Sequence, residues 1–225
     1  MRLLLLARAA GLHCIAVTDH NRIDGALRCV ELAAGDPSLP RVIPGVEVTC
    51  AQGEVIGLFV RDPIPRGRDV EETIELIRSR EGVVYLPHPF DTMRRATVRP
   101  QDVERVGGCV DVIEVANGRS LIPGANGRAL ALAARLGKRL GAGSDAHFAG
   151  EVGRCFLELS DEAVSHGRLD LCSRDEFLRA LAHARPQGMH PLRGVSTAWA
   201  FALGTGLLKA GRRTRNRLRS GSQGT

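Results

Sequence analysis

The sequence predicts an α/β protein in which strands and helices alternate within one large domain. Three observations support this fold class. The chain has 225 residues and is 44% hydrophobic, which is enough for a single sizeable core. Short β-branched runs alternate with amphipathic helical patterns, and glycines separate many of them. Polar residues cluster where several apolar runs end. Alternation of this kind indicates a mainly parallel sheet, either open or closed into a barrel.

The first ninety residues alternate between the two kinds of element. Helices are expected where apolar residues recur with helical spacing and a glycine follows, which selects residues 3–10, 24–34 and 70–80. Strands are expected where β-branched residues run together, which selects residues 14–18, 42–49, 55–60 and 83–86. Gly53 lies between the second and third of these strands, so they are expected to form a hairpin or a short strand pair.

The rest of the body continues the same order. Pro100 is typical of a first helical turn, and Gly137 is typical of a helix end. The helical segments are expected at residues 100–105, 127–136 and 174–184. The strands are expected at residues 110–115, 138–142 and 155–159, of which the run at 138–142 is the weakest.

Charge divides the chain into two parts. The formal net charge is +6, but every charged side chain from Arg193 onward is basic, so residues 1–192 are close to neutral. We therefore predict one domain at residues 1–192 and a C-terminal part at residues 193–225, made of an apolar helix and a basic, disordered tail. The apolar stretch at 195–210 is shorter than the ~20 residues of a membrane span, so no transmembrane segment is expected. The basic tail is a candidate for weak nucleic-acid contact.

The cysteines and the N-terminus indicate a cytoplasmic protein. None of the six cysteines forms a C-x-x-C pair, and several lie in apolar runs, so we expect buried free thiols. The first six residues resemble the start of a signal peptide, but Arg8 interrupts the apolar run and the helical spacing continues to Ala10. A short core helix is therefore the better interpretation.

Four clusters of hard metal ligands follow the apolar runs: Thr18-Asp19-His20, Pro44-Gly45-Val46-Glu47, Pro87-His88-Pro89 and Gly143-Ser144-Asp145-Ala146-His147. In α/β folds the carboxyl ends of parallel strands meet at one edge of the sheet, so these clusters are expected to converge. Imidazole and carboxylate ligands together suit Zn²⁺, Mn²⁺ or Fe²⁺. The sequence therefore predicts a metal-dependent hydrolase.

Local spacing suggests how two of the clusters converge. Asp145 and His147 are two residues apart, so they project to one side if the strand geometry persists. Asp19 and His20 are adjacent and need a bend after their strand, with which Asn21 is consistent.

Each cluster also has a purely structural interpretation. Asp19 could cap the following helix, and Glu47 could belong to a structural ion pair. His88 could be a core or loop histidine, although its two flanking prolines are expected to hold its backbone extended and to aim its ring. The shared topological position of the four clusters favours the metal site.

The succession TDHN, PGVEVT, LPHPFD, DVIEVANGR and GAGSDAH resembles the PHP (polymerase and histidinol phosphatase) superfamily over about residues 3–160. The resemblance implies a distorted (β/α)7 barrel that holds two or three divalent ions and hydrolyses phosphoesters. By the same resemblance Glu47 would bridge two ions, Asp145 would bind the same pair, and His88 would serve the second ion.

The resemblance also implies roles for other residues. His20 and His147 would share a third ion. Asn117 or Glu114 would stand where many members place another ligand. Asp19 would orient its neighbour rather than bind metal.

One departure from the family concerns the N-terminus. Family members open with a strand that bears His-x-His, and this sequence begins within the helix that follows it. The barrel is therefore expected to lack its first strand, and the first ion is expected to lose two imidazoles. His13 precedes a strand at its amino end and is expected to be a surface or loop histidine. Either the true start lies upstream of Met1, or the chain is a remnant with impaired metal binding.

Arginines near the clusters are candidates for clamping phosphate as planar forks: Arg94, Arg95, Arg119 and Arg154. We predict that the catalytic residues are Asp19, Asp145, Arg119 and Arg154. The sequence has no glycine-rich phosphate loop, and Ser144 is better interpreted as a small neighbour of Asp145 than as a nucleophile.

The predicted reaction is hydrolysis of a phosphate ester by a metal-activated water. A small phosphate monoester, a nucleotide or an oligonucleotide would fit, and the aromatic content of 4% gives little sign of a base-stacking platform. Two alternatives stay open: a metal-dependent amidohydrolase, and a non-catalytic PHP remnant with a binding role.

Overall fold

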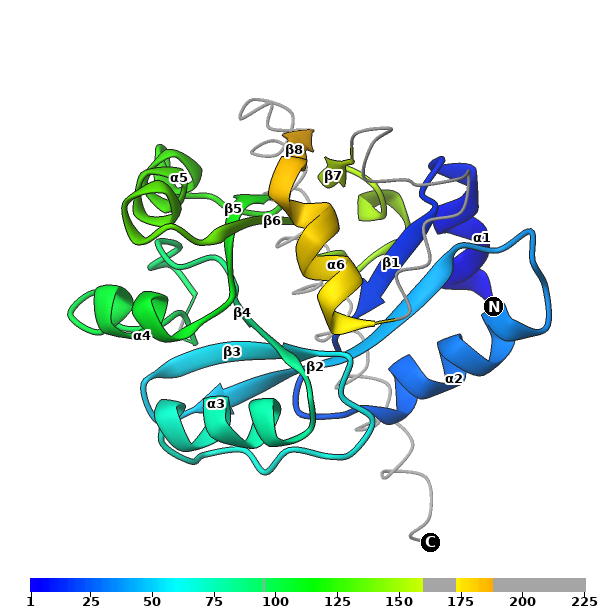
Figure 1. The fold of residues 1–225 in the computed structure, drawn as a ribbon. Coiled ribbons are helices and arrows are strands. Elements are labelled where there is room, and N and C mark those ends of the chain that lie inside the picture. The colour runs from blue at the N-terminus through cyan, green and yellow to red at the C-terminus, as the bar shows by residue number, and fades with distance from the viewer. Residues whose placement is uncertain (95, 160–172, 188–225) are drawn as a thin grey trace, which may run out of the picture. The chain divides into compact units, whose positions relative to one another are not determined.

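The computed structural model describes residues 1–94, 96–159 and 173–187 (Figure 1). The chain divides at residue 189 into two units, and the second unit, 190–225, lies outside the described residues. The predicted helix and basic tail at residues 193–225 therefore stay predictions. In the described part of the chain, no helix combines the length and the hydropathy needed to cross a bilayer.

The described elements alternate much as the sequence predicts. The helices are α1 (Arg2–Ala9), α2 (Asp24–Ala34), α3 (Val70–Ser79), α4 (Val103–Cys109), α5 (Ala125–Leu136) and α6 (Arg174–Ala180), with short 3-10 turns η1 (Ala149–Glu151) and η3 (Leu181–His183). The strands are β1 (Cys14–Val17), β2 (Arg41–Cys50), β3 (Gly53–Leu58), β4 (Val83–Leu86), β5 (Val112–Asn117), β6 (Arg139–Gly143), β7 (Phe156–Glu158) and β8 (Arg185–Gln187).

Six strands form one curled, half-barrel sheet in the order β1 to β6. The pairs β1–β2, β4–β5 and β5–β6 are parallel, whereas β3 runs antiparallel to both β2 and β4. The hairpin expected around Gly53 is thus confirmed, and the sheet is mixed. Strands β7 and β8 form a separate two-stranded sheet.

The two faces of the curled sheet pack against different elements. Val46, Val48 and Ile113 belong to an outer core that includes Ile74 and Ile77 of α3. A second cluster of buried residues forms the inner core: Ile43, Ile56, Leu58, Val83, Tyr85, Val112, Leu181 and Ala184. Figure 1 shows α6 crossing the hollow of the sheet while α3, α4 and α5 lie outside it. Because side chains alternate between faces along a strand, polar residues between the outer-core valines of β2 project inward.

Some elements and cysteines differ from the predictions. Helix α4 begins at Val103, because residues 100–102 form a turn before it. The last helix ends at Ala180 and is followed by η3 and β8. The five described cysteines are free, but only Cys50 and Cys155 are buried, whereas the other three are half-buried. Each of those three lies on an element face only partly covered by its neighbours.

Candidate metal centre

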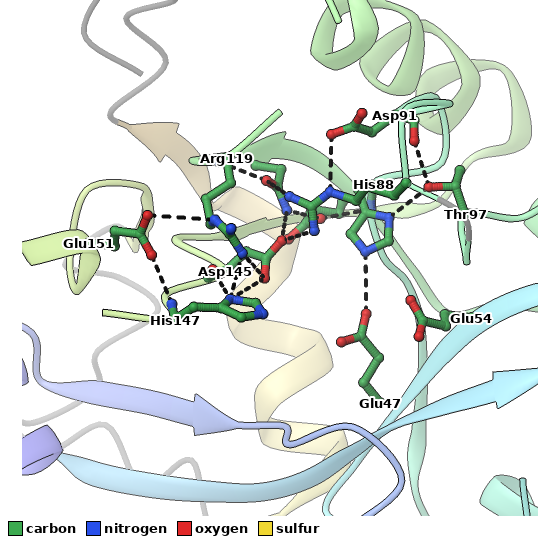
Figure 2. Close-up of polar contacts among 12 residues, drawn as sticks. Glu47, Glu54, His88, Asp91, Thr97, Arg119, Asp145, His147 and Glu151 are labelled. Atoms are coloured by element: carbon green, nitrogen blue, oxygen red, sulfur yellow. Dashed lines mark hydrogen bonds and ion pairs between the residues drawn. The ribbon is translucent and has the colours of Figure 1, made fainter. Parts of the chain in front are cut away.

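The ligand clusters meet at one edge of the curled sheet. Figure 2 shows Glu47, His88, Asp145 and His147 there, and His20 lies beside Glu47. His20 follows β1, Glu47 lies in β2, and His88 follows β4. Asn117 ends β5, and Asp145 follows β6. This edge holds the carboxyl ends of the parallel strands, as expected for folds of this kind.

Glu54 is a further member of the site that the sequence analysis missed. It is the second residue of β3 and pairs in register with Thr49 of β2. Because β3 runs antiparallel, its beginning lies beside the carboxyl end of β2. Glu54 therefore reaches the same edge as Glu47 from the opposite chain direction. The signal in the sequence was a glutamate directly after the Gly53 turn, with Ile56 of the inner core two residues later.

His20, Glu47 and Glu54 form a group that can hold a metal ion. The His20 Nδ1 atom lies 3.3 Å from Glu47 Oε2 and 3.2 Å from Glu54 Oε1. One ligand atom from each of the three residues lies within 4.8 Å of the others. Both glutamates are buried, and burial together with the charge of Glu47 raises the pKa of Glu54. Two buried carboxylates around one imidazole favour a bound cation.

A left-handed turn places His20 over β2. Asn21 has φ +56° and its backbone N–H donates to Glu47 O at 2.8 Å. Its side-chain oxygen accepts from the Thr49 N–H at 2.9 Å, and its amide nitrogen donates to Thr49 Oγ1 at 3.1 Å. The expected bend after Asp19-His20 is confirmed. The bend is held by hydrogen bonds to the next strand.

The hydrogen bonds of His88 show which ring nitrogen is available. Thr97 Oγ1 donates its single proton to Asp91 O at 2.8 Å, so it accepts a proton from His88 Nδ1, 3.3 Å away. The other nitrogen, Nε2, faces Glu47 Oε1 at 3.3 Å. Burial disfavours the charged ring, but the hydrogen bond to Glu47 and the charge of Glu114 outweigh it and raise the pKa of His88. Nε2 therefore either donates a proton to Glu47 in a hydrogen bond or, when unprotonated, shares a metal cation with it.

The expectation of an extended backbone at His88 was wrong. Its φ is +30°, although Pro89 follows, and its backbone N–H donates to Glu114 Oε2 at 2.7 Å. Such a conformation is costly for a residue with a side chain and persists only where surrounding bonds enforce it. The ring is aimed by Thr97 and Glu114 rather than by the prolines.

Glu114 lies beneath the site as a shared acceptor. It accepts from Tyr85 Oη at 3.2 Å, from the His88 N–H at 2.7 Å and from Asn117 Nδ2 at 2.9 Å. Gly143 leaves room for it, because a Cβ there would lie 2.8 Å from Glu114 Oε1. Burial raises the pKa of Glu114 to about 7. Asn117 and Glu114 were the two candidates for one further ligand position. Glu114 orients His88 and Asn117 through these hydrogen bonds.

Asp145 and His147 were expected to converge by alternation along a strand. In the structure they converge through a turn instead. Strand β6 ends at Gly143, and Asp145 has φ +51°. The His147 Nδ1 atom lies 2.9 Å from the Asp145 carbonyl oxygen and 3.5 Å from its Oδ1. A proton on Nδ1 would be donated to that carbonyl and would leave Nε2 free for an ion, whereas a proton on Nε2 would let Nδ1 accept from Arg119 Nη1, 2.6 Å away. The rings of His20 and His147 have centroids 6.1 Å apart, and an ion shared between them stays a prediction.

Two arginines surround the Asp145 carboxylate. Arg94 Nη1 contacts Asp145 Oδ2, and Arg119 Nη1 lies 3.9 Å from Oδ1. Asn117 Nδ2 also donates to Oδ2 at 3.2 Å. Burial opposes ionisation of Asp145, but Arg94 outweighs it and lowers the pKa of that carboxyl. Asp145 is therefore held as a carboxylate by guanidinium groups.

Arg119 lies between the carboxylates of Asp145 and Glu151 and also contacts His147. Its Nε lies 3.6 Å from Glu151 Oε1, and its Nη1 lies 2.6 Å from His147 Nδ1. Glu151 is buried and also accepts the His147 N–H at 2.8 Å. The sequence analysis missed Glu151, which lies in η1, four residues after His147.

The other predicted residues lie further from the ligands. The Asp19 carboxylate contacts Gly25 at the start of α2 and is exposed. Arg154 is exposed, and its backbone N–H donates to Glu151 O at 3.2 Å. Arg95 lies outside the described residues. The catalytic roles of Asp19 and Arg154 stay predictions.

The site thus has two halves (Figure 2). The imidazole half consists of His20, Glu47, Glu54 and His88. The arginine half consists of Asn117, Asp145 and His147 with Arg94 and Arg119. Ser144 takes no part in either half, because its hydroxyl accepts from the Gly153 N–H at 3.0 Å and donates to Cys155 O at 3.1 Å.

Comparisons with known proteins concern the fold and the family. A family model described as PHP-associated matches residues 123–186. A two-domain protein of Bacteroides vulgatus with a PHP-like metal-dependent phosphoesterase superposes with TM-score 0.58 and 18% identity, over 86% of this chain and 64% of that one. The resemblance of this chain to the PHP superfamily is confirmed. The match at 123–186 extends beyond residue 160, where the sequence motifs end.

Other relatives support the fold. PsfC of Pseudomonas syringae superposes with TM-score 0.64 and 21% identity, covering 91% of this chain and 88% of that one. An uncharacterised protein of Methanocaldococcus jannaschii is 33% identical over 169 residues, which are 74% of this chain and 65% of the relative. A second protein of that organism is 36% identical over 94 residues and is matched over 54% of its length. The chain therefore spans just under two thirds of the first archaeal relative and about half of the second.

The donors in the imidazole half fit a divalent ion. Two buried carboxylates and the imidazoles are the mixture of oxygen and nitrogen ligands that Zn²⁺, Mn²⁺ and Fe²⁺ accept. The Thr97 hydroxyl fixes the proton of His88 on Nδ1, which is how proteins commonly prepare Nε2 for metal binding.

Proposed function

We propose that this protein is a metal-dependent phosphoesterase on a distorted PHP-type barrel. The observation that carries the proposal is the meeting of His20, Glu47 and Glu54, with His88 Nε2 directed at Glu47. Buried carboxylates whose ion pairs, in the described part of the chain, are with imidazoles are costly without a further cation. The group would hold Mn²⁺, Zn²⁺ or Fe²⁺, and a total of two or three ions would also use Asp145, Asn117 and His147.

Each residue has a defined task in this proposal. An ion bound there supplies a water of lowered pKa and neutralises phosphate oxygens. Glu47 lies between the two imidazoles and is placed to share an ion, and Glu54 completes the ligand set. Arg119, held by Glu151, lies beside Asp145 and would contribute positive charge toward a phosphate oxygen. Arg154 is exposed and follows Glu151 by three residues. It would add positive charge near the arginine half.

The substrate class follows from the charges near the ligands. The negatively charged phosphate of a small monoester or of a nucleotide would be attracted by the arginines. A short oligonucleotide is a larger candidate substrate that carries the same phosphate groups. The same ions would also activate water for amide hydrolysis. The arginines favour an anionic substrate, so we rank the phosphoesterase above the amidohydrolase and above a non-catalytic role.

The proposal is tested by metal content and phosphate release from p-nitrophenyl phosphate, measured on the full chain and on Glu54→Gln. The wild type is expected to retain at least one Mn²⁺, Zn²⁺ or Fe²⁺ after dialysis and to release p-nitrophenol. Glu54→Gln is expected to lose both properties. Glu31→Gln, which removes an exposed glutamate paired with Arg28 on α2, is the matched control. Metal-loaded wild type without phosphatase or phosphodiesterase activity would contradict the proposal.

A further inference from the structure

The guanidinium of Arg94 occupies a position between three oxygen-bearing side chains. Its Nε donates to Asp91 Oδ2 at 3.1 Å, its Nη1 contacts Asp145 Oδ2, and its Nη2 lies 3.4 Å from Asn117 Oδ1. The Arg94 side chain is 24% exposed and the Asp145 side chain 16% exposed. A single fixed cation therefore contacts two of the residues expected to bind a metal, Asp145 and Asn117.

The neighbours of Arg94 hold it in that place. Asp91 is 2% exposed, and its Oδ1 is buried without a hydrogen-bond partner in the described part of the chain. The contact of Oδ2 with Arg94 is therefore the bond that compensates a buried carboxylate, and breaking it would be costly. Burial opposes the charge of Arg94, but Asp145 and Asp91 outweigh it and raise the pKa of the guanidinium. Arg94 is anchored as a permanent positive charge.

The two halves of the site differ in what compensates their carboxylates. Glu47 and Glu54 form their described ion pairs with imidazoles, whose ring nitrogens are themselves metal ligands. Asp145 also lies near an imidazole, with His147 Nδ1 3.5 Å from its Oδ1, but in addition it pairs with two guanidinium groups, which stay charged at any ordinary pH. Asp145 Oδ2 cannot bind an ion at the position that Arg94 Nη1 occupies. An ion on this side must displace Arg94 and would lie close to its positive charge.

We propose that Arg94 is an internal cation that competes with a divalent ion for Asp145 and Asn117. The imidazole half then binds its ion tightly, and the arginine half binds a further ion weakly or not at all while Arg94 is in place. This inference rests on the proposed metal site, and it assigns Arg94 a part in setting how many ions the chain holds. It also distinguishes Arg94 from Arg119, which remains the candidate for contact with substrate.

The test is Mn²⁺ binding by the full chain, measured by equilibrium dialysis with elemental analysis. The variants are Arg94→Met, which keeps the apolar stem and removes the charge, and Arg94→Lys, which keeps a charge without the fork. The double variant Asp91→Asn, Arg94→Met avoids leaving the Asp91 carboxylate buried and unpaired. Arg22→Met, which removes an exposed arginine paired with Asp24, is the control. Circular dichroism establishes that each variant is folded.

The expected result is that wild type, Arg94→Lys and Arg22→Met bind one Mn²⁺ tightly. Arg94→Met and the double variant are expected to bind an additional Mn²⁺, or to bind it at least about tenfold more tightly, which is the size of one close charge interaction. Equal stoichiometry and affinity in wild type and both Arg94→Met variants would overturn the inference and leave the metal site standing. Absence of Mn²⁺ binding in every folded variant would overturn the inference together with the proposed function.

Discussion

The imidazole half and the arginine half of the site lie at the same edge of one sheet but treat negative charge differently. In the first, buried Glu47 and Glu54 face imidazoles, and the pKa of Glu54 is raised. In the second, Asp145 faces Arg94 and Arg119, and its pKa is lowered. In the proposed metal site, a carboxylate paired with imidazoles would be open to a metal ion, whereas a carboxylate already paired with guanidinium groups would not. The groups around each carboxylate, and not the ligand type alone, would then decide where an ion binds.

The sharpest way to break this comparison is to remove one carboxylate from each half. Glu47→Gln is expected to abolish retained metal and to lower phosphoesterase activity at least about a hundredfold, because Glu47 contacts both imidazoles. Asp145→Asn is expected to keep the tightly bound ion. Metal content by elemental analysis and phosphate release measure both effects. Equal metal loss in the two variants would show that the halves act as one ligand set.

A second prediction concerns the residue behind His88. Thr97→Val removes the acceptor of the Nδ1 proton and is expected to weaken Mn²⁺ binding by about 10–100-fold, the usual effect of losing such a support. Thr97→Ser keeps the hydroxyl and is expected to restore affinity. The measurement is a Mn²⁺ titration at constant pH. Unchanged affinity in Thr97→Val would exclude this role.

The third prediction concerns pH and sharpens the contrast in charge. Burial raises the pKa of Glu114 to about 7 from an ordinary value of 4.5. The folded state therefore holds a proton that the unfolded state releases, and the resulting stability is present below about pH 4.5 and is lost as pH rises through about 7. The free energy of unfolding of the chelator-treated protein is expected to fall over this range, and less steeply in Glu114→Gln. Denaturant titrations at several pH values measure it, and parallel curves for both proteins would contradict the assignment.

The smallest expected effect belongs to the turn that carries His20. Asn21→Gly keeps the left-handed backbone conformation but removes the two side-chain bonds to Thr49. The free energy of unfolding is expected to fall by about 1–2 kcal/mol, and Mn²⁺ affinity by a small factor. Thermal unfolding with and without Mn²⁺ separates the two effects. A variant with wild-type stability would show that the backbone bond to Glu47 is sufficient.

The order of elements could be predicted because it depends on local patterns. Helix α2 and strand β4 have the predicted bounds, and the hairpin at Gly53 was recognised from its turn. Helix α4 was placed too early, because Pro100 is compatible with both a first helical turn and the turn that precedes one. The candidate ligands His20, Glu47 and His88 were identified because each follows or lies in an apolar strand.

Other parts of the site depend on how strands pair and how loops fold back on them. Glu54 reaches the ligands only because β3 runs antiparallel to β2. Thr97 reaches His88 because the loop after β4 folds back by nine residues. Asp145 and His147 meet through a left-handed residue, whereas alternation along a strand had been expected. Glu54 had a local signal, its position directly after the Gly53 turn, whereas the contacts of Thr97 and Asp145 depend on how the chain folds in three dimensions.

The sequence by itself determined the kind of chemistry available: carboxylates and imidazoles at strand ends, a nearly neutral body and a basic C-terminal part. Those features depend on residue type and on neighbours along the chain. Only the tertiary structure decided how the charges pair, with imidazoles around Glu47 and Glu54 and with guanidinium groups around Asp145. The physical reason is that the free energy of a buried charge depends on every group within a few ångströms, and the fold alone brings those groups together.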